Sequence, residues 1–246
     1  MTRRFLIQAH PHRPEARQAA DLVTTELVRY GIDTVTAVDS GDIELAIVLG
    51  GDGTILRTAE LTRGRPTPLV GINLGHVGFL AEYEAEQLTD VVRRAAERDY
   101  SVEERMTLDV SVQGPDGQVQ TGWAINEVSV EKDRRERMVE VALGIDGRAL
   151  STFGCDGVVL ATPTGSTAYA FSAGGPVVWP DVDAMIMLPV SAHALFARPL
   201  VVGPGSRMSV EILARSHTDA VLWCDGRRRL TAAPGAHIDV VRGSAP

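Results

Sequence analysis

Two patterns of hydrophobic and polar positions divide this chain of 246 residues. In roughly the first hundred residues, short apolar runs alternate with segments whose apolar residues recur every three or four positions, as in strands and amphipathic helices. The apolar runs predict strands at residues 3–9, 32–38, 44–50 and 67–75. The periodic segments predict helices at residues 14–31, 54–64 and 84–100. This alternation of strand and helix is typical of an α/β domain with a parallel sheet.

The first and last of these helices indicate the face that they would bury. The first helix has Pro14 near its start and Gly31 as its stop. Its apolar positions are Ala19, Leu22, Val23 and Leu27. In the last helix the corresponding positions are Leu88, Val91, Val92, Ala95 and Ala96. Both helices belong to the same predicted α/β layer pattern.

After about Met106 the period changes to the strict alternation of half-buried strands. A Gly-Pro-Asp-Gly turn at 114–117 and the pair Asp146-Gly147 predict hairpins. Further short strands are predicted at 157–163, 199–203, 208–214, 220–230 and 237–243. We therefore predict an α/β domain at 1–104 with a parallel sheet, followed by a mostly β domain at 105–246.

Composition narrows the class of protein. The net charge is −8, from 32 acidic and 24 basic residues, which disfavours a general nucleic-acid or membrane-surface binder because both partners are anionic. No stretch approaches the ~20 apolar residues of a membrane helix, and the apolar run near the start is too short for a signal peptide. We expect a cytoplasmic protein. The two cysteines, Cys155 and Cys224, lack metal-ligand spacing and are expected to be small buried thiols.

The stretch VLGGDGTILR at 48–57 ends an apolar strand in glycines just before a helix. Such a loop presents backbone N–H groups to phosphate, and glycine lets the phosphates approach the main chain. It is neither a Walker A loop nor a G-x-G-x-x-G fingerprint. Asp52 would repel a phosphate unless it binds magnesium or accepts a proton from an attacking hydroxyl, both of which phosphoryl transfer requires. The alternative is an Asp-Gly turn without function.

A second stretch, at 154–178, offers hydroxyls and backbone amides to a ribose, a base edge or a phosphate, although such loops are often ordinary turns. Its hydroxyl-bearing residues are Thr162, Thr164, Ser166, Thr167 and Tyr169. Gly-Gly-Asp-Gly-Thr followed by Thr-Pro-Thr-Gly-Ser-Thr-Ala-Tyr resembles the NAD kinase family. The residues around these motifs look most similar to those of its actinobacterial members. The segments 73–82, 126–127, 193–199 and 224–226 resemble further family motifs, in the family order. The resemblance covers nearly the whole chain.

The resemblance implies a two-domain fold and transfer of the terminal phosphoryl group of ATP, or of inorganic polyphosphate, to the 2′-hydroxyl of the adenosine ribose of NAD. It implies that Asp52 is the base and that a divalent ion such as Mg²⁺ is required, with no protein ligand assigned. The donor phosphates would be held by Gly50, Gly51, Gly53 and Thr54. The residues expected to bind NAD are Phe79, Asn126, Glu127, Asp156, Thr164, Thr167, Ala168 and Tyr169.

Several of these assignments have plainer alternatives. Asn126 and Glu127 could form a strand-end turn, and Phe79 with Leu80 could belong to the core. Asp225, in the late Asp-Gly pair, is a weaker candidate because hairpin turns use the same pair.

Two other functions remain open from the sequence. Lipid and sugar kinases share Gly-Gly-Asp-Gly but lack the second stretch, and they would not bind NAD saturably. A catalytically silent NAD(P)-binding protein would bind the dinucleotide without turnover. Family members assemble as homodimers or homotetramers, so the resemblance also implies an oligomer. It implies, too, a segment after the last strand that returns to the first domain, whereas this sequence ends at Pro246.

Overall fold

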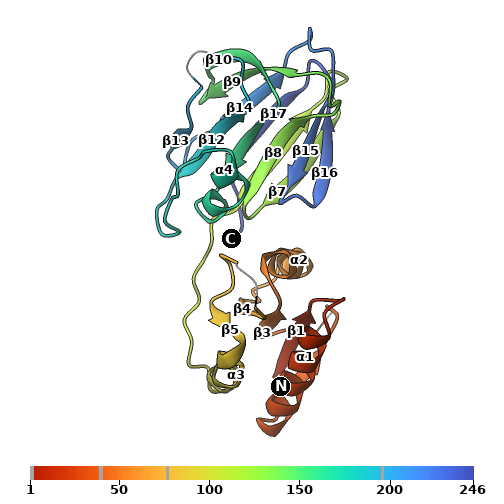
Figure 1. Cartoon of the computed structure of the whole chain (residues 1–246), viewed down its shortest axis with the longest axis vertical. Helices are drawn as coiled ribbons and strands as arrows, with labels where there is room; N and C mark the ends of the chain where they lie inside the picture. The colour runs from red at the N-terminus through yellow and green to blue at the C-terminus, as the bar shows by residue number, and fades with distance from the viewer. Residues whose placement is uncertain (1–2, 39–40, 76–77, 195–196) are drawn as a thin grey trace. The chain divides into compact units, whose positions relative to one another are not determined.

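The chain divides into two units, Met1–Glu103 and Glu104–Pro246 (Figure 1). The computed structural model describes residues 3–38, 41–75, 78–194 and 197–246. Each unit has its own hydrophobic core, so each is described by itself.

The N-terminal unit is built on a five-stranded sheet in the order β2-β1-β3-β4-β5, whose neighbouring strands are parallel. The strands are β1 (Arg4–Ala9), β2 (Asp33–Val35), β3 (Leu45–Leu49), β4 (Leu69–Asn73) and β5 (Tyr83–Glu84). The helices are α1 (Pro14–Arg29), α2 (Asp52–Thr62) and α3 (Leu88–Glu97), with a short 3₁₀ turn η1 (Ala85–Gln87) before α3. The predicted parallel α/β layer is confirmed.

The core of this unit lies between the sheet and the helices α1 and α3, whose buried residues share one cluster with those of β1, β3 and β4. The apolar stripe predicted on α3 is buried throughout. On α1 the buried residues are Ala16, Ala19, Val23 and Leu27, whereas Leu22 is 60 % exposed. The position of Leu22 fits the helical period, but its side chain faces solvent.

The C-terminal unit consists of two six-stranded antiparallel sheets. The first has the order β10-β9-β14-β17-β6-β7, formed by Arg148–Cys155, Val139–Ile145, Met208–Ile212, His237–Arg242, Leu108–Gln113 and Val119–Ala124. The second has the order β13-β12-β11-β8-β15-β16, formed by Leu200–Val202, Met185–Val190, Gly157–Ala161, Glu127–Lys132, Ala220–Cys224 and Arg228–Ala232. The predicted mostly β character of this part is confirmed.

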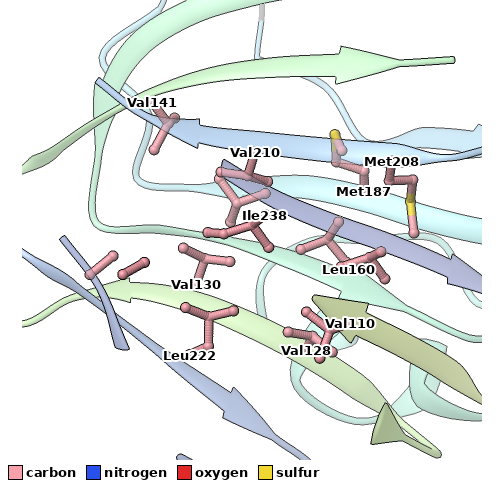
Figure 2. Close-up of a cluster of buried hydrophobic side chains, with 14 of the residues drawn as sticks. Val110, Val128, Val130, Val141, Leu160, Met187, Met208, Val210, Leu222 and Ile238 are labelled. Atoms are coloured by element: carbon pink, nitrogen blue, oxygen red, sulfur yellow. The ribbon is translucent and has the colours of Figure 1, made fainter. Parts of the chain in front are cut away.

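Apolar side chains of both sheets form one core (Figure 2). Figure 2 shows Val210 and Ile238 of the first sheet with Val130 and Leu160 of the second. On the opposite face of the second sheet, the short 3₁₀ turn η2 (Thr164–Thr167) leads into α4 (Tyr169–Ser172). A smaller apolar cluster joins α4 to β11 and β12. The second sheet is therefore covered on both faces near β11, which explains why all five residues of β11 are buried.

Two local predictions in this unit are confirmed, the hairpin at Asp146-Gly147 and the burial of both cysteines. The hairpin between β9 and β10 turns at Asp146 and Gly147, which have φ of 52° and 73°. The cysteines are buried and free, and burial raises the pKa of the Cys155 thiol to about 12.

The sequence did not predict β12, since its run of methionines and Pro189 is not typical of a central strand. Among the described helices, none has the length and apolarity to span a bilayer.

Candidate functional site

The glycine-rich loop connects β3 to α2, at the carboxyl edge of the parallel sheet. Its backbone is attached to both neighbouring strands: Gly50 N–H donates to Ile72 O and His10 N–H to Leu49 O, each at 3.0 Å. The helix begins at Asp52, two residues earlier than the sequence predicted. The first N–H groups of a helix have no acceptor within the helix and carry partial positive charge. The loop is therefore fixed in place with donors that can receive an anion.

The glycines of this loop are required for different reasons. A Cβ at Gly50 would lie 2.6 Å from Oγ1 of the buried Thr54, so packing within the unit excludes a side chain there. A Cβ at Gly51 or at Gly53 would meet no atom within 4 Å, and neither residue has a positive φ. The fold itself therefore does not demand glycine at these two positions, whereas a ligand lying against the backbone would.

The carboxylate of Asp52 connects this loop to the one that follows β4. Oδ2 accepts a hydrogen bond from Phe79 N–H and Oδ1 accepts one from Leu80 N–H, both at 3.1 Å. The approach depends on Gly78, where a Cβ would lie 2.7 Å from Asp52 Oδ1. An ionised carboxylate has about four lone-pair positions. Asp52 is thus held in one orientation and keeps lone pairs with which it can accept a proton.

Phe79 projects from this second loop with 68 % of its surface exposed. The alternative that it belongs to the core was therefore wrong, and its side chain is accessible to a ligand. The family-like segments 73–82 and 193–199 include His76, Val77, Leu195 and Phe196, which lie outside the described residues.

In the C-terminal unit, Asn126 and Glu127 lie where β7 ends and β8 begins. Both residues are buried. The backbone there is held by two other segments: Asn126 N–H donates to Asp225 Oδ1 at 2.7 Å, and Asn126 O accepts from Thr162 N–H at 2.9 Å. The side-chain atoms Asn126 Oδ1 and Glu127 Oε2 have no hydrogen-bond partner among the described residues. Buried polar atoms are usually paired, so these two are candidates for contact with a ligand.

The hydroxyl-rich loop packs directly against this pair. Thr162 Oγ1 donates to Ile125 O at 2.6 Å and accepts from Gly165 N–H at 3.0 Å. Gly165 lies so close to Asn126 that a Cβ there would be 1.9 Å from Asn126 O. Some hydroxyls predicted to face a ligand are used inside the loop: Ser166 Oγ donates to Val178 O at 3.1 Å. The backbone of the loop, rather than its hydroxyls alone, therefore shapes the surroundings of Asn126.

Comparison with known proteins identifies the family. The ATP-NAD kinase N-terminal domain matches residues 3–100, and the ATP-NAD kinase C-terminal domain matches residues 125–246. The chain belongs to the NAD kinase family. It is similar to NAD kinase 2 of Streptomyces coelicolor, with 50% identity over 99% of this chain and 88% of that protein. NAD kinase of Thermobifida fusca is also 50% identical, over 99% of this chain and 83% of that one.

Solved structures of similar fold agree with this membership. An NAD kinase from Archaeoglobus fulgidus in complex with ATP has a TM-score of 0.77 at 28% identity, covering 100% of this chain and 92% of that chain. Yeast NADH kinase complexed with NADH has a TM-score of 0.88 at 24% identity, covering 98% and 80%. The latter likeness concerns the fold alone. The resemblance to NAD kinases drawn from the sequence motifs is confirmed.

The carboxyl of Glu127 is buried near a second acidic side chain, that of Asp225. The pKa of its carboxyl is raised from 4.5 to about 7, mainly by burial and also by the nearby negative charge of Asp225, while a hydrogen bond from the backbone N–H of Tyr169 acts in the opposite direction. Because Tyr169 follows η2, this contact brings the start of α4 beside Glu127. The predicted residues Thr164, Thr167, Ala168 and Tyr169 thus lie in the segment that covers Asn126 and Glu127.

Replacing Glu127 by Gln should remove a pH dependence of stability. Since the folded-state pKa is above 4.5, the folded state holds this proton longer than the unfolded chain as pH rises. The resulting contribution is fully present below about pH 4.5 and lost as pH rises through about 7. Relative to Glu127→Gln, the unaltered protein should lose up to about 3 kcal/mol of unfolding free energy between these limits. Urea denaturation of both proteins at pH 5 and pH 8 measures the difference.

The control for this prediction is Glu211→Gln, which changes an exposed glutamate on β14. It should follow the pH dependence of the unaltered protein. Equal pH dependence of Glu127→Gln and Glu211→Gln would contradict the raised pKa of Glu127.

Asp156 lies at the other end of the β8–β11 pair. Glu127 pairs with Ala161, whereas Gly157 pairs with Glu131, so the ends are separated by four residues, about 13 Å along a strand. Asp156 forms an ion pair with Lys132, and this hydrogen bond lowers the pKa of its carboxyl. The structure therefore does not place Asp156 beside Asn126, although both belong to the same sheet.

Two residues that sequence reasoning gave little or no weight are central to these arrangements. Asp225, considered a weak candidate, occupies a turn with φ of 54° and also buries its carboxylate against the backbone of Ile125 and Asn126. Gly78 was not singled out, although its lack of a side chain permits the contacts of Asp52. In both cases the partner is distant in sequence, so local spacing carried no signal.

Proposed function

We propose that this protein is an NAD kinase that transfers the terminal phosphoryl group of ATP to the 2′-hydroxyl of the adenosine ribose of NAD, giving NADP. Membership of the family supports the reaction class. The observation that carries the proposal is the pair of open glycines, Gly51 and Gly53, on either side of the fixed carboxylate of Asp52. This arrangement combines a surface for phosphate with a base.

In the proposed mechanism, the donor phosphates lie against the backbone of Gly50, Gly51 and Gly53, with Thr54 beside them. The N–H groups at the start of α2 would stabilise the negative charge that develops on the transferred group. The acceptor hydroxyl loses its proton to Asp52 as its oxygen bonds to the terminal phosphorus, and the bond from that phosphorus to the bridging oxygen breaks to release ADP. The same amides can bind inorganic polyphosphate, so we propose it as a second donor.

The dinucleotide would be held mainly by the C-terminal unit. Asn126 Oδ1 and Glu127 Oε2, buried without partners among the described residues, would accept hydrogen bonds from ribose hydroxyls or the adenine edge. The remaining proposed NAD-binding residues are Phe79, Asp156, Thr164, Thr167, Ala168 and Tyr169. The exposure of Phe79 is compatible with stacking or apolar contact on the adenosine.

The test is formation of NADP from NAD and Mg²⁺, with ATP and polyphosphate supplied separately. Turnover with ATP would support the proposal, and turnover with polyphosphate would extend it. Saturable NAD binding without any turnover would favour a silent NAD(P)-binding protein. Absence of NAD binding would favour a lipid or sugar kinase, a reading that the match of the C-terminal domain argues against.

Removal of divalent metal ions should stop the reaction. Within the described residues, no group of three or more His, Cys, Asp or Glu side chains could hold a metal ion. Mg²⁺ commonly keeps several waters and binds substrate phosphates with few protein ligands, so this is compatible with an ion carried by the donor. The ion would neutralise charge along the donor phosphates. NADP formation should fall to background in excess EDTA and return when Mg²⁺ is added, and an unchanged rate in EDTA would contradict the requirement.

We also propose that the protein is a cytoplasmic homodimer or homotetramer. The C-terminal unit exposes three large apolar side chains close together in sequence, Phe171, Val177 and Trp179, which are compatible with a contact between copies. Light scattering after size-exclusion chromatography measures the number of chains per particle. A monomer at micromolar concentration would contradict this part of the proposal.

A further inference from the structure

In the C-terminal unit, Arg228 contacts both Trp123 and Asp225 at the edges of the two sheets. The guanidinium carbon of Arg228, on β16, lies 4.0 Å from the ring centroid of Trp123, on β7. Its Nη2 is 2.6 Å from Oδ2 of Asp225, whose side chain is only 2 % exposed. Cation–π contact on one side and a charge-assisted hydrogen bond on the other fix the position of the guanidinium. These contacts therefore join the edge of one sheet to the edge of the other.

The carboxylate of Asp225 also accepts hydrogen bonds from the backbone of Ile125 and Asn126. Asp225 Oδ1 accepts from Ile125 N–H at 3.0 Å and from Asn126 N–H at 2.7 Å. The backbone N–H of Asp225 donates to Glu127 O at 3.0 Å, so the contact runs in both directions. One buried residue thus fixes three consecutive residues at the start of β8. Hydrogen bonds from N–H groups to an ionised carboxylate are stronger than neutral ones, so these bonds stabilise one backbone conformation of Ile125 and Asn126.

Two of the three residues held in this way, Asn126 and Glu127, each have one buried side-chain oxygen without a partner among the described residues. Asn126 Oδ1 and Glu127 Oε2 are buried and make no hydrogen bond to any described residue. A turn that served the fold alone would be expected to pair such atoms or expose them to water. Rigid backbone combined with unpaired side-chain acceptors is instead the arrangement of a preorganised binding site.

We propose that Asp225, held by Arg228 and Trp123, is a positioning residue that orients Asn126 and Glu127 to receive NAD. This inference rests on the proposed role of Asn126 and Glu127 in NAD binding. Asp225 itself acts through the backbone, and Arg228 acts through Asp225. Arg228 therefore affects the affinity for the dinucleotide without contacting it.

The experiment compares Arg228→Gln with Arg229→Gln. Arg229 is the next residue on β16, is exposed, and lies 3.5 Å from Asp133 in a surface ion pair. Arg228→Gln should raise KM for NAD about tenfold, the effect of one lost charge-assisted bond, with kcat and KM for ATP nearly unchanged. Arg229→Gln should leave all three unchanged. Arg228→Lys should recover only part of the effect, because an ammonium keeps the charge but not the planar stacking.

A purely structural role predicts a different result. In that case Arg228→Gln would lower the melting temperature and the amount of active protein while KM for NAD stayed the same, and the positioning role would be overturned. Calorimetric titration of each variant with NAD measures affinity independently of turnover. If the unaltered protein neither binds nor phosphorylates NAD, the proposed function fails together with this inference. If it does both, and Arg228→Gln matches Arg229→Gln, only the positioning role fails.

Discussion

Asp52→Asn should lower kcat for NADP formation by about 10²–10⁴-fold while NAD still binds, because an amide cannot take the proton of the attacking hydroxyl. The amide oxygen can still accept one of the two bonds from Phe79 N–H and Leu80 N–H. Its nitrogen faces the other donor, which should cost about 1 kcal/mol of stability and leave the unit folded. Initial rates at saturating NAD and ATP, with calorimetric titration of NAD, measure both effects.

Two further variants separate loss of the base from loss of structure. Asp21→Asn, on the exposed face of α1, should leave kcat unchanged. Gly78→Ala keeps the carboxylate but places a Cβ 2.7 Å from Oδ1 of Asp52, so it should lower kcat by turning the base away from its position. A wild-type kcat in Asp52→Asn would rule out Asp52 as the base.

Gly165→Ala should destabilise the C-terminal unit by about 3 kcal/mol and abolish NAD binding. The added Cβ would lie 1.9 Å from Asn126 O and 2.3 Å from Asn126 C. Both are backbone atoms of Asn126, whose carbonyl oxygen accepts from Thr162 N–H and whose N–H donates to Asp225, so no flexible side chain can move to make room. Urea denaturation measures the loss in unfolding free energy, and titration with NAD measures binding.

Gly205→Ala is the matched control for this prediction, since a Cβ there meets no atom within 4 Å. It should retain the stability and the NAD affinity of the unaltered protein. Thr162→Val gives an intermediate case, because it removes the hydroxyl that bonds Ile125 O and Gly165 N–H without adding bulk. If Gly165→Ala unfolds at the same urea concentration as Gly205→Ala, the close approach is not a constraint in solution.

The fold was predictable where the deciding interactions are local. Hydrophobic period separated the α/β layer from the β-rich part, and Asp146-Gly147 marked its hairpin because both residues adopt a positive φ. The sequence pattern was not sufficient where burial and pairing depend on distant segments. Leu22 fits the stripe of α1 but faces solvent, and β12 was missed although it lies between β11 and β13 in the second sheet.

By itself, the sequence determined the family and the class of chemistry, since its two glycine-containing motifs are specific and their residue types suit phosphate and ribose. Only the tertiary structure decided how those residues are held. Asp52 receives its two hydrogen bonds from residues 27 and 28 positions away. Asp225 reaches Asn126 across 99 positions. Contacts of this kind arise from the pairing of strands and loops in space, and no local pattern of residues encodes them.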